Sequence, residues 1–242
     1  MIFWFVRLFA AHLLADFVFQ FGFVYRLKVR GPWGLLLHTV IVAAIAGVVL
    51  GLFLPHLSYS QLGIALFVVG ITHFSLDWLK AYLKARGHYE GLAGFLGDQL
   101  SHTAVLMVIA AWLLPSAPME NSTATNWPDV LLNDLYWWIL VGSILVTYLV
   151  GFTLFYLEGQ PTNAGSPIIG RYSGFWERLA IFGLVALGPF WSWVLLPAPT
   201  FLRGLYLTQL RQDPLPPSRS LLLGPLLAAL TGAVIRAFFI PA

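Results

Sequence analysis

Long apolar runs follow one another along this chain, separated by short polar connections. Each run is about 20 residues long, the length of helix that crosses the hydrocarbon core of a bilayer. We expect about seven membrane-spanning segments, with approximate limits at residues 2–21, 34–54, 62–83, 95–114, 135–157, 179–196 and 221–240. The pattern predicts an all-α, polytopic membrane helical bundle.

The composition agrees with this class. Hydrophobic residues make up 59% of the chain and charged residues only 10%, against about 25% in ordinary globular domains. The chain has no cysteine, so nitrogen and oxygen atoms must supply the ligands of any metal. Its basic residues are scattered over short connections, so the net charge of +3 indicates membrane topology. We expect a lipid bilayer and no nucleic acid as partner.

Charges in the connections predict the orientation. The connections at residues 25–32 and 84–90 are basic, whereas residues 115–134 contain three acidic residues and no Lys or Arg. Cytoplasmic connections are enriched in Lys and Arg. We therefore expect both basic connections in the cytoplasm and the N-terminus on the other side. The predicted organisation is a four-helix domain over 1–115, a non-cytoplasmic loop over 116–134 and further membrane helices over 135–242.

The C-terminal part breaks the simple alternation of sides. Arg203, Arg211 and Arg219 lie in a connection that alternation would place outside the cell. Either the trend fails there, or the segment 179–196, with a kink at Gly188-Pro189, is re-entrant. We favour seven spans, with Thr200 to Leu210 forming a short interfacial helix.

Histidine and aspartate recur at helical spacing in the first four segments. Residues four apart share one face of a helix. Because successive segments alternate in direction, each Asp should lie nearer the cytoplasm and each His roughly 6 Å deeper. These predicted metal ligands are His12, Asp16, His38, His73, Asp77, Asp98 and His102.

The same spacing indicates an internal repeat. His73 follows His12 by 61 residues and His102 follows His38 by 64. We therefore expect the first four segments to form two pseudo-repeated hairpins related by an axis along the membrane normal. The repeat is incomplete, because Gly34 stands where the second hairpin has Asp98.

Imidazole nitrogens and carboxylate oxygens are the usual ligands of zinc, iron and manganese. Seven ligands are too many for one zinc and would suit two metals, as in two-metal hydrolysis of phosphoesters or amides. We expect one or two divalent ions as cofactor. We expect a metal-activated water as nucleophile, with Asp77, Asp98 and Lys80 in catalysis and Gln20 and Gln99 in support. A site near the cytoplasmic lipid boundary predicts a lipid-like, amphiphilic substrate.

Two other interpretations stay open. Buried His, Asp and Lys often form interhelical pairs that hold a bundle together, and Lys80 and Arg26 could balance part of the aspartate charge. The chain would then be a non-catalytic membrane subunit, with Glu177 and Arg178 available for docking a membrane protein partner.

A proton- or ion-coupled transporter is the third interpretation. It expects polar residues across the whole membrane, whereas the outer halves of the first four segments are apolar apart from Arg7.

The motifs resemble those of a known family. His12-x-x-x-Asp16-Phe17-x-x-Gln20, His38, His73-x-x-x-Asp77-x-x-Lys80 and Asp98-Gln99-x-x-His102 look like the signature of the bacterial domain-of-unknown-function 3307 membrane family. Residues 170–178 are similar to a Gly-x-x-Ile-Gly-x-x-Glu-Arg stretch in its longer members. The resemblance implies a multi-pass protein of the bacterial inner membrane and brings no activity with it.

Overall fold

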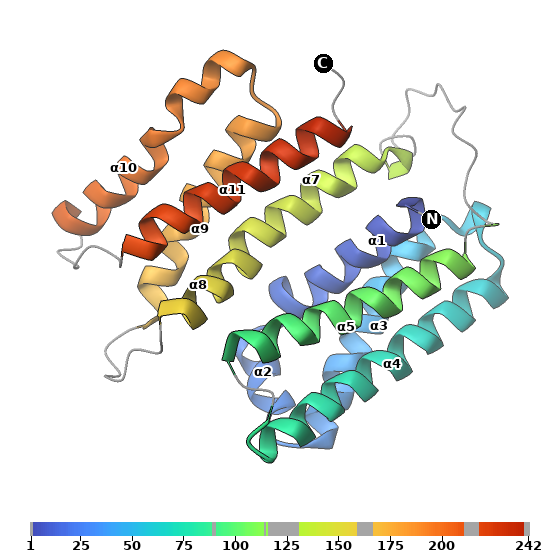
Figure 1. Ribbon diagram of the computed structural model, residues 1–242. Helices are drawn as coiled ribbons and strands as arrows, with labels where there is room; N and C mark the ends of the chain where they lie inside the picture. Colours follow the sequence, from blue (N-terminus) through green and yellow to red (C-terminus); the bar gives the residue numbers. More distant parts are fainter. Residues whose placement is uncertain are drawn as a thin grey trace. The chain divides into compact units, whose positions relative to one another are not determined.

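The computed structural model describes residues 2–88, 91–113, 115, 131–158, 167–210 and 218–239. All regular structure within these ranges is helical (Figure 1), which confirms the predicted all-α class. The chain divides into two compact units, Met1–Trp137 and Trp138–Ala242. Most of the predicted non-cytoplasmic loop, residues 116–130, lies outside the described residues.

Unit 1 is a ring of four long helices. Helices α1 and α4 each pack against both α3 and α5, as Figure 1 shows in blue to green. This packing is the one expected if a two-fold axis along the bundle relates the hairpin of α1 and α3 to the hairpin of α4 and α5. The elements are α1 (Ile2–Leu13), η1 (Leu14–Val18), α2 (Gly22–Lys28), α3 (Pro32–Gly51), η2 (Leu54–His56), α4 (Tyr59–Ala85) and α5 (Gly91–Trp112).

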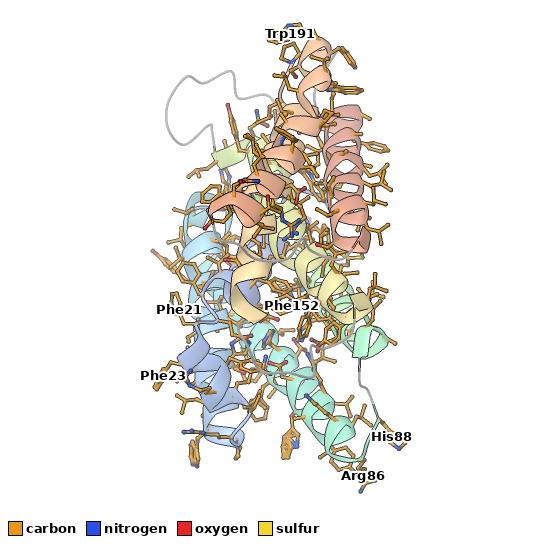
Figure 2. All side chains as sticks on the ribbon, turned by 90° about the vertical axis from the view of Figure 1, so that its left-hand side faces the viewer. Phe21, Phe23, Arg86, His88, Phe152 and Trp191 are labelled. Carbon is orange, nitrogen blue, oxygen red and sulfur yellow. The ribbon has the colours of Figure 1, made fainter. Side chains whose placement is uncertain are left out.

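A sharp bend separates the first helix from α2. The segment Ile2–Val18 meets Gly22–Lys28 at 92°, so most of the predicted basic loop at 25–32 is helical. Phe21 and Phe23 are exposed and lie along the outer side of this part of unit 1 (Figure 2). The inner side of α2 packs against α3.

Gly34 makes this packing close. A Cβ atom at position 34 would lie 1.9 Å from the carbonyl oxygen of Leu27 and 2.8 Å from the amide nitrogen of Lys28. Only a residue without a side chain lets the backbone of α2 lie there. The repeat lacks an acid at this position because α2 occupies the space.

Side-chain and backbone caps define the ends of α4. The Ser58 hydroxyl accepts from the Gln61 amide, and the Gln61 side chain accepts from the Ser58 amide, which forms a capping box. At the other end Gly87 has φ +75°, and the amides of Gly87 and His88 donate to the carbonyls of Lys84 and Leu83. This Schellman motif ends the helix.

Both basic connections lie at the same end of unit 1. The α4–α5 connection, with Arg86 and His88 labelled in Figure 2, lies at the end where α2 leads into α3 (Figure 1). This arrangement is the one that the positive-inside trend requires of two cytoplasmic connections.

Arg7 is buried in unit 1, where both of its terminal nitrogens donate hydrogen bonds. Its Nη1 donates to Asp134 Oδ1 at 2.5 Å, and its Nη2 donates to the carbonyls of Leu131 and Leu132 at 2.7 and 2.9 Å. The guanidinium also lies 3.5 Å from the ring centre of Phe3. Arg7 therefore fixes the start of α7 against α1, which is a structural role.

Unit 2 contains the remaining helices, in yellow to red in Figure 1. Helices α9 and α11 pack together, and α10 packs against α9. The chain enters the unit within α7. The elements are α7 (Asp134–Ile144), η4 (Leu145–Leu149), α8 (Val150–Glu158), α9 (Pro167–Ala186), η5 (Phe190–Leu195), α10 (Pro197–Leu205), η6 (Tyr206–Leu210) and α11 (Ser218–Phe239).

The predicted span 179–196 is not one kinked helix. Helix α9 ends at Ala186, and after Pro189 the chain reverses through η5 so that α10 returns beside α9 (Figure 1). Proline cannot continue the hydrogen-bonded ladder of α9. The predicted interfacial helix at 200–210 therefore belongs to this returning limb, and Arg203 on it is buried.

Among the described residues, five or six stretches are candidates for the seven spans that we expected. Five stretches are long and apolar enough to cross a membrane, and the bent pair of α1–η1 and α2 gives a sixth. Helix α9 carries three charged residues and is not among them. The five stretches are Pro32–Gly51, Tyr59–Ala85, Gly91–Trp112, Asp134–Leu157 and Ser220–Phe239.

Candidate metal centre

The structure brings all seven predicted ligands together inside unit 1. They come from four helices of the ring, and none is more than 8% exposed. Their ligand atoms form three overlapping groups, in each of which all atoms lie within 4.8 Å of one another. The groups are His12, His73 and His102; Asp16, His38 and His73; and Asp77, Asp98 and His102.

Four of these side chains form a compact set. Nε2 of His38 lies 3.0 Å from Asp16 Oδ1 and 3.1 Å from His73 Nε2. Asp77 Oδ2 lies 3.2 Å from His73 Nε2 and 3.6 Å from His38 Nε2, and Asp16 Oδ1 lies 3.5 Å from His73 Nε2. Ligands about 2.0–2.1 Å from a tetrahedral zinc are roughly 3.3 Å apart. The five separations average close to that value.

His38 Nε2 faces more polar atoms than it can hydrogen-bond. His38 Nε2 faces an oxygen of Asp16, Nε2 of His73 and, at 3.5 Å, Nε2 of Gln20. A ring nitrogen carries at most one proton, so it cannot bond to all of these atoms at once. A cation between the nitrogens and the carboxylates would satisfy them together.

A second, wider group joins α4 and α5. His102 Nε2 is 3.6 Å from Asp98 Oδ1 and 3.9 Å from Asp77 Oδ1. Nε2 of His12 and of His102 are buried and have no hydrogen-bond partner among the described residues. The rings of His12, His73 and His102 line a cavity of about 10 Å³, which is close to the space that one water needs. Apolar residues of the four-helix ring, Leu8 and Val42 among them, form the rest of the cavity wall.

Two lysines reach the carboxylates from the end with the basic connections. Lys28 Nζ lies 2.7 Å from Asp77 Oδ2, and Lys80 Nζ lies 2.5 Å from Asp98 Oδ2. The Lys28 side chain is 15% exposed and that of Lys80 is 33% exposed, whereas both carboxylates are buried. The lysines therefore connect the buried cluster with the exterior.

Lys28 was missed by sequence reasoning, which named Arg26 as the second cation. The seven-residue helix α2 carries both residues, and its inner side directs Lys28 to Asp77. Residues 22–28 are too short a stretch to be assigned as a helix from their pattern alone, so the sequence carried no signal that singled out Lys28.

The two glutamines contact different members of the cluster. Gln20 lies in the break between η1 and α2, with its Nε2 beside His38. Gln99 donates from Nε2 to Asp98 Oδ2 at 3.3 Å. Each glutamine therefore contacts one of the clustered side chains, and a supporting role for either stays a prediction.

Local backbone geometry positions Asp16. Residues Leu14–Val18 form a π-helical turn, closed by the amide of Phe19 donating to the carbonyl of Leu14 at 2.8 Å. Such turns insert one residue into a helix and often occur at functional sites. The turn follows directly on His12 and leaves Asp16 facing His38 on α3.

Glu177 and Arg178 do not form a docking surface. Both are buried within unit 2, where Glu177 Oε2 accepts from Arg203 Nη1 at 2.5 Å. Arg178 donates from Nε and Nη2 to the carbonyls of Val146 and Thr147. The expectation that they bind a partner is wrong, because helix packing within the unit uses both side chains.

These features define the class of protein: a helical protein of membrane type with a buried His/Asp cluster in its N-terminal unit. The chain belongs to the family described as Protein of unknown function (DUF3307), whose model matches residues 4–130. All seven clustered side chains lie within this match. No curated protein and no solved structure matches the chain.

Proposed function

We propose that this chain is a metal-dependent membrane hydrolase that acts on a lipid-like phosphoester. In this proposal Asp16, His38, His73 and Asp77 hold one divalent transition metal, either zinc, iron or manganese. The observation that carries the proposal is the spacing of their four ligand atoms, at 3.0–3.6 Å in five pairs. The ligand atoms of Asp16, His38 and His73 all lie within 4.8 Å of one another. Asp77 Oδ2 lies beside two of them and also 2.7 Å from Lys28 Nζ, so the ion would share this oxygen with the ammonium group.

The charges of the cluster support a cation. Asp16, Asp77 and Asp98 carry three negative charges, and Lys28 and Lys80 supply two positive ones. With neutral imidazoles, one negative charge remains in a buried site. An uncompensated charge is costly in this environment. One divalent ion removes the deficit and leaves a single positive charge for an anionic substrate.

A divalent ion supplies a nucleophilic water at neutral pH and polarises a phosphoryl oxygen. In hydrolysis, the water oxygen bonds to phosphorus, the bond from phosphorus to the alcohol oxygen breaks, and the alcohol oxygen takes up a proton. Asp98 lies outside the four-ligand set and is our candidate for accepting the proton of the water. Lys80, at the exposed edge beside Asp98, would orient the phosphate.

The substrate would approach from the basic end of unit 1. The cavity beside the imidazoles is about the size of one water, so a lipid-like molecule cannot enter it. The partly exposed Lys28 and Lys80 contact two of the buried carboxylates and lead outward from them. We place this end at the cytoplasmic side of the bacterial inner membrane and the N-terminus on the opposite side, following the positive-inside trend.

Metal content tests the proposal. The full chain, purified in detergent without chelator, is expected to retain one equivalent of a transition metal by elemental analysis. His38→Ala should lose it, whereas His56→Ala, which changes an exposed histidine in η2, should retain it. Hydrolysis of a long-chain nitrophenyl phosphodiester should disappear together with the metal. Wild-type protein that stays metal-free after incubation with zinc, iron and manganese would refute the proposal.

One observation favours a second candidate, the non-catalytic subunit. The pairs Lys28–Asp77 and Lys80–Asp98 neutralise two of the three carboxylates without any metal. In that case the cluster fixes helix packing, and replacing His38 lowers the thermal stability of a protein that never contained metal. Elemental analysis and melting curves on the same samples separate the two candidates.

A further inference from the structure

We infer that unit 1 has a second cation site, formed by Asp98, His102 and the other oxygen of Asp77, with Asp77 bridging the two ions. This inference rests on the proposed function, because it adds a second ion to the same centre. It also specifies the substrate as an anion.

Asp77 faces two separate groups of ligands. Its Oδ2 lies 3.2 Å from His73 Nε2 and 3.6 Å from His38 Nε2, while its Oδ1 lies 3.9 Å from His102 Nε2. A carboxylate between two ligand groups can bind one ion through each oxygen. Two-metal sites hold their ions about 3.5–4 Å apart, a separation that a carboxylate spans.

Buried atoms without partners point to the second site independently. His102 is 3% exposed, and its Nε2 has no hydrogen-bond partner among the described residues. The same holds for Asp77 Oδ1 and for Nε2 of His12, whose ring centre lies 4.9 Å from that of His102. Buried polar atoms are rarely left unsatisfied. A cation beside His102 would bind His102 Nε2 and Asp77 Oδ1. The ring of His12 is near enough to add a further nitrogen.

The second site is looser than the first. The distances from His102 Nε2 to Asp98 Oδ1 and Asp77 Oδ1 are 3.6 and 3.9 Å, against 3.0–3.6 Å among Asp16, His38, His73 and Asp77. The ligands must move inward to contact one small ion at about 2.0–2.2 Å. The second ion should therefore bind more weakly and leave first during dialysis.

A second ion changes the charge of the centre and the role of Asp98. Two divalent ions with three carboxylates and two lysines give three positive charges, which a phosphate monoester dianion and a hydroxide would balance. A neutral amide would leave this charge uncompensated. Asp98 then binds the ion through Oδ1 and keeps Oδ2 for Lys80, whose ammonium group lies 2.5 Å away. Asp98 is a metal ligand in this state, and activation of the water falls to the two ions.

Manganese binding to the full chain in detergent tests the inference. Equilibrium dialysis should give two Mn²⁺ per wild-type chain, with a spin-coupled electron paramagnetic resonance signal. His102→Gln and Asp98→Asn should each bind one Mn²⁺ with an uncoupled signal. His38→Ala should retain only the weaker ion, and Asp77→Asn should weaken both. His88→Ala, in the exposed α4–α5 connection, is the matched control and should bind two.

The outcomes separate the two proposals. Wild-type protein that binds one Mn²⁺, with no change in His102→Gln, would overturn the second site and leave the proposed function intact. Wild-type protein that binds no metal would overturn both. Asp98→Asn is nearly isosteric, so it tests the second site even if His102→Gln fails to fold. A melting curve for each variant shows which of them are folded.

Discussion

Replacing Gly34 by alanine should detach α2 from the site without touching any proposed metal ligand. The added Cβ would lie 1.9 Å from the carbonyl oxygen of Leu27. Contacts of this kind are not found below 3.0 Å, so α2 and α3 must separate by about 1.1 Å or more. Both contacting groups are backbone, and no side-chain rotation can relieve the clash.

The cost can be estimated from the two opposing effects. Overpacking of a close contact costs about 1–3 kcal/mol, and alanine recovers up to about 1 kcal/mol of helix propensity over glycine. We expect a net loss of about 1–2 kcal/mol. At about 2–4 °C per kcal/mol for a chain of this length, the Tm should fall by roughly 2–8 °C. The same shift stretches the 2.7 Å contact between Lys28 and Asp77 beyond hydrogen-bonding distance.

Thermal melting in detergent and amine labelling measure the two effects. Gly34→Ala should melt below wild type, and Lys28 should react faster with an amine-specific reagent. Gly51→Ala is the control, because it lies at the end of the same helix and its added Cβ would meet nothing within 4 Å. If Gly34→Ala has the same Tm as Gly51→Ala and Lys28 keeps its wild-type reactivity, α2 does not pack closely against α3.

Two further substitutions test contacts of single cations. Lys28→Met removes the partner of a buried carboxylate, a change that costs about 3–5 kcal/mol. The Tm of Lys28→Met should fall more in the presence of a chelator than in the presence of zinc, because a bound metal also compensates the negative charge of Asp77. An equal fall under both conditions would contradict this prediction. Arg178→Lys should cost about 1–3 kcal/mol, because one ammonium cannot replace two hydrogen bonds to carbonyls of η4. Arg236→Lys is its contrast in the same melting assay, since Arg236 donates through Nη1 alone, and equal losses would contradict the assignment.

The periodic part of the site could be predicted from the sequence. His73 and Asp77 are four residues apart on one long apolar helix, so a shared face follows directly from helical geometry. The repeat of this spacing in the first segment, and its reversal in the fourth, then places the imidazoles at a common level. This reasoning needs only the helical spacing and the alternating direction of successive segments.

The parts that depend on chain reversals could not be predicted in this way. Lys28 reaches Asp77 only because the chain bends by 92° after η1, and no proline marks that bend. Proline does mark the reversal after α9, but Gly188-Pro189 fits a kink as well as a turn. The missing acid at Gly34 was visible as a gap in the repeat. Its cause, the nearby backbone of Leu27, is a contact between elements that no local pattern contains.

The near-complete enclosure of the seven ligands has a kinetic consequence. Their side chains are at most 8% exposed, so the more tightly bound ion, among Asp16, His38, His73 and Asp77, should exchange slowly, as neighbouring helices part. Such opening is rare in a well-packed bundle. This ion would thus be captured as the hairpins assemble, whereas the weaker second ion would exchange with the buffer. The identity of the captured ion in a purified sample should record the metals present in the growing cell more closely than those in the buffer.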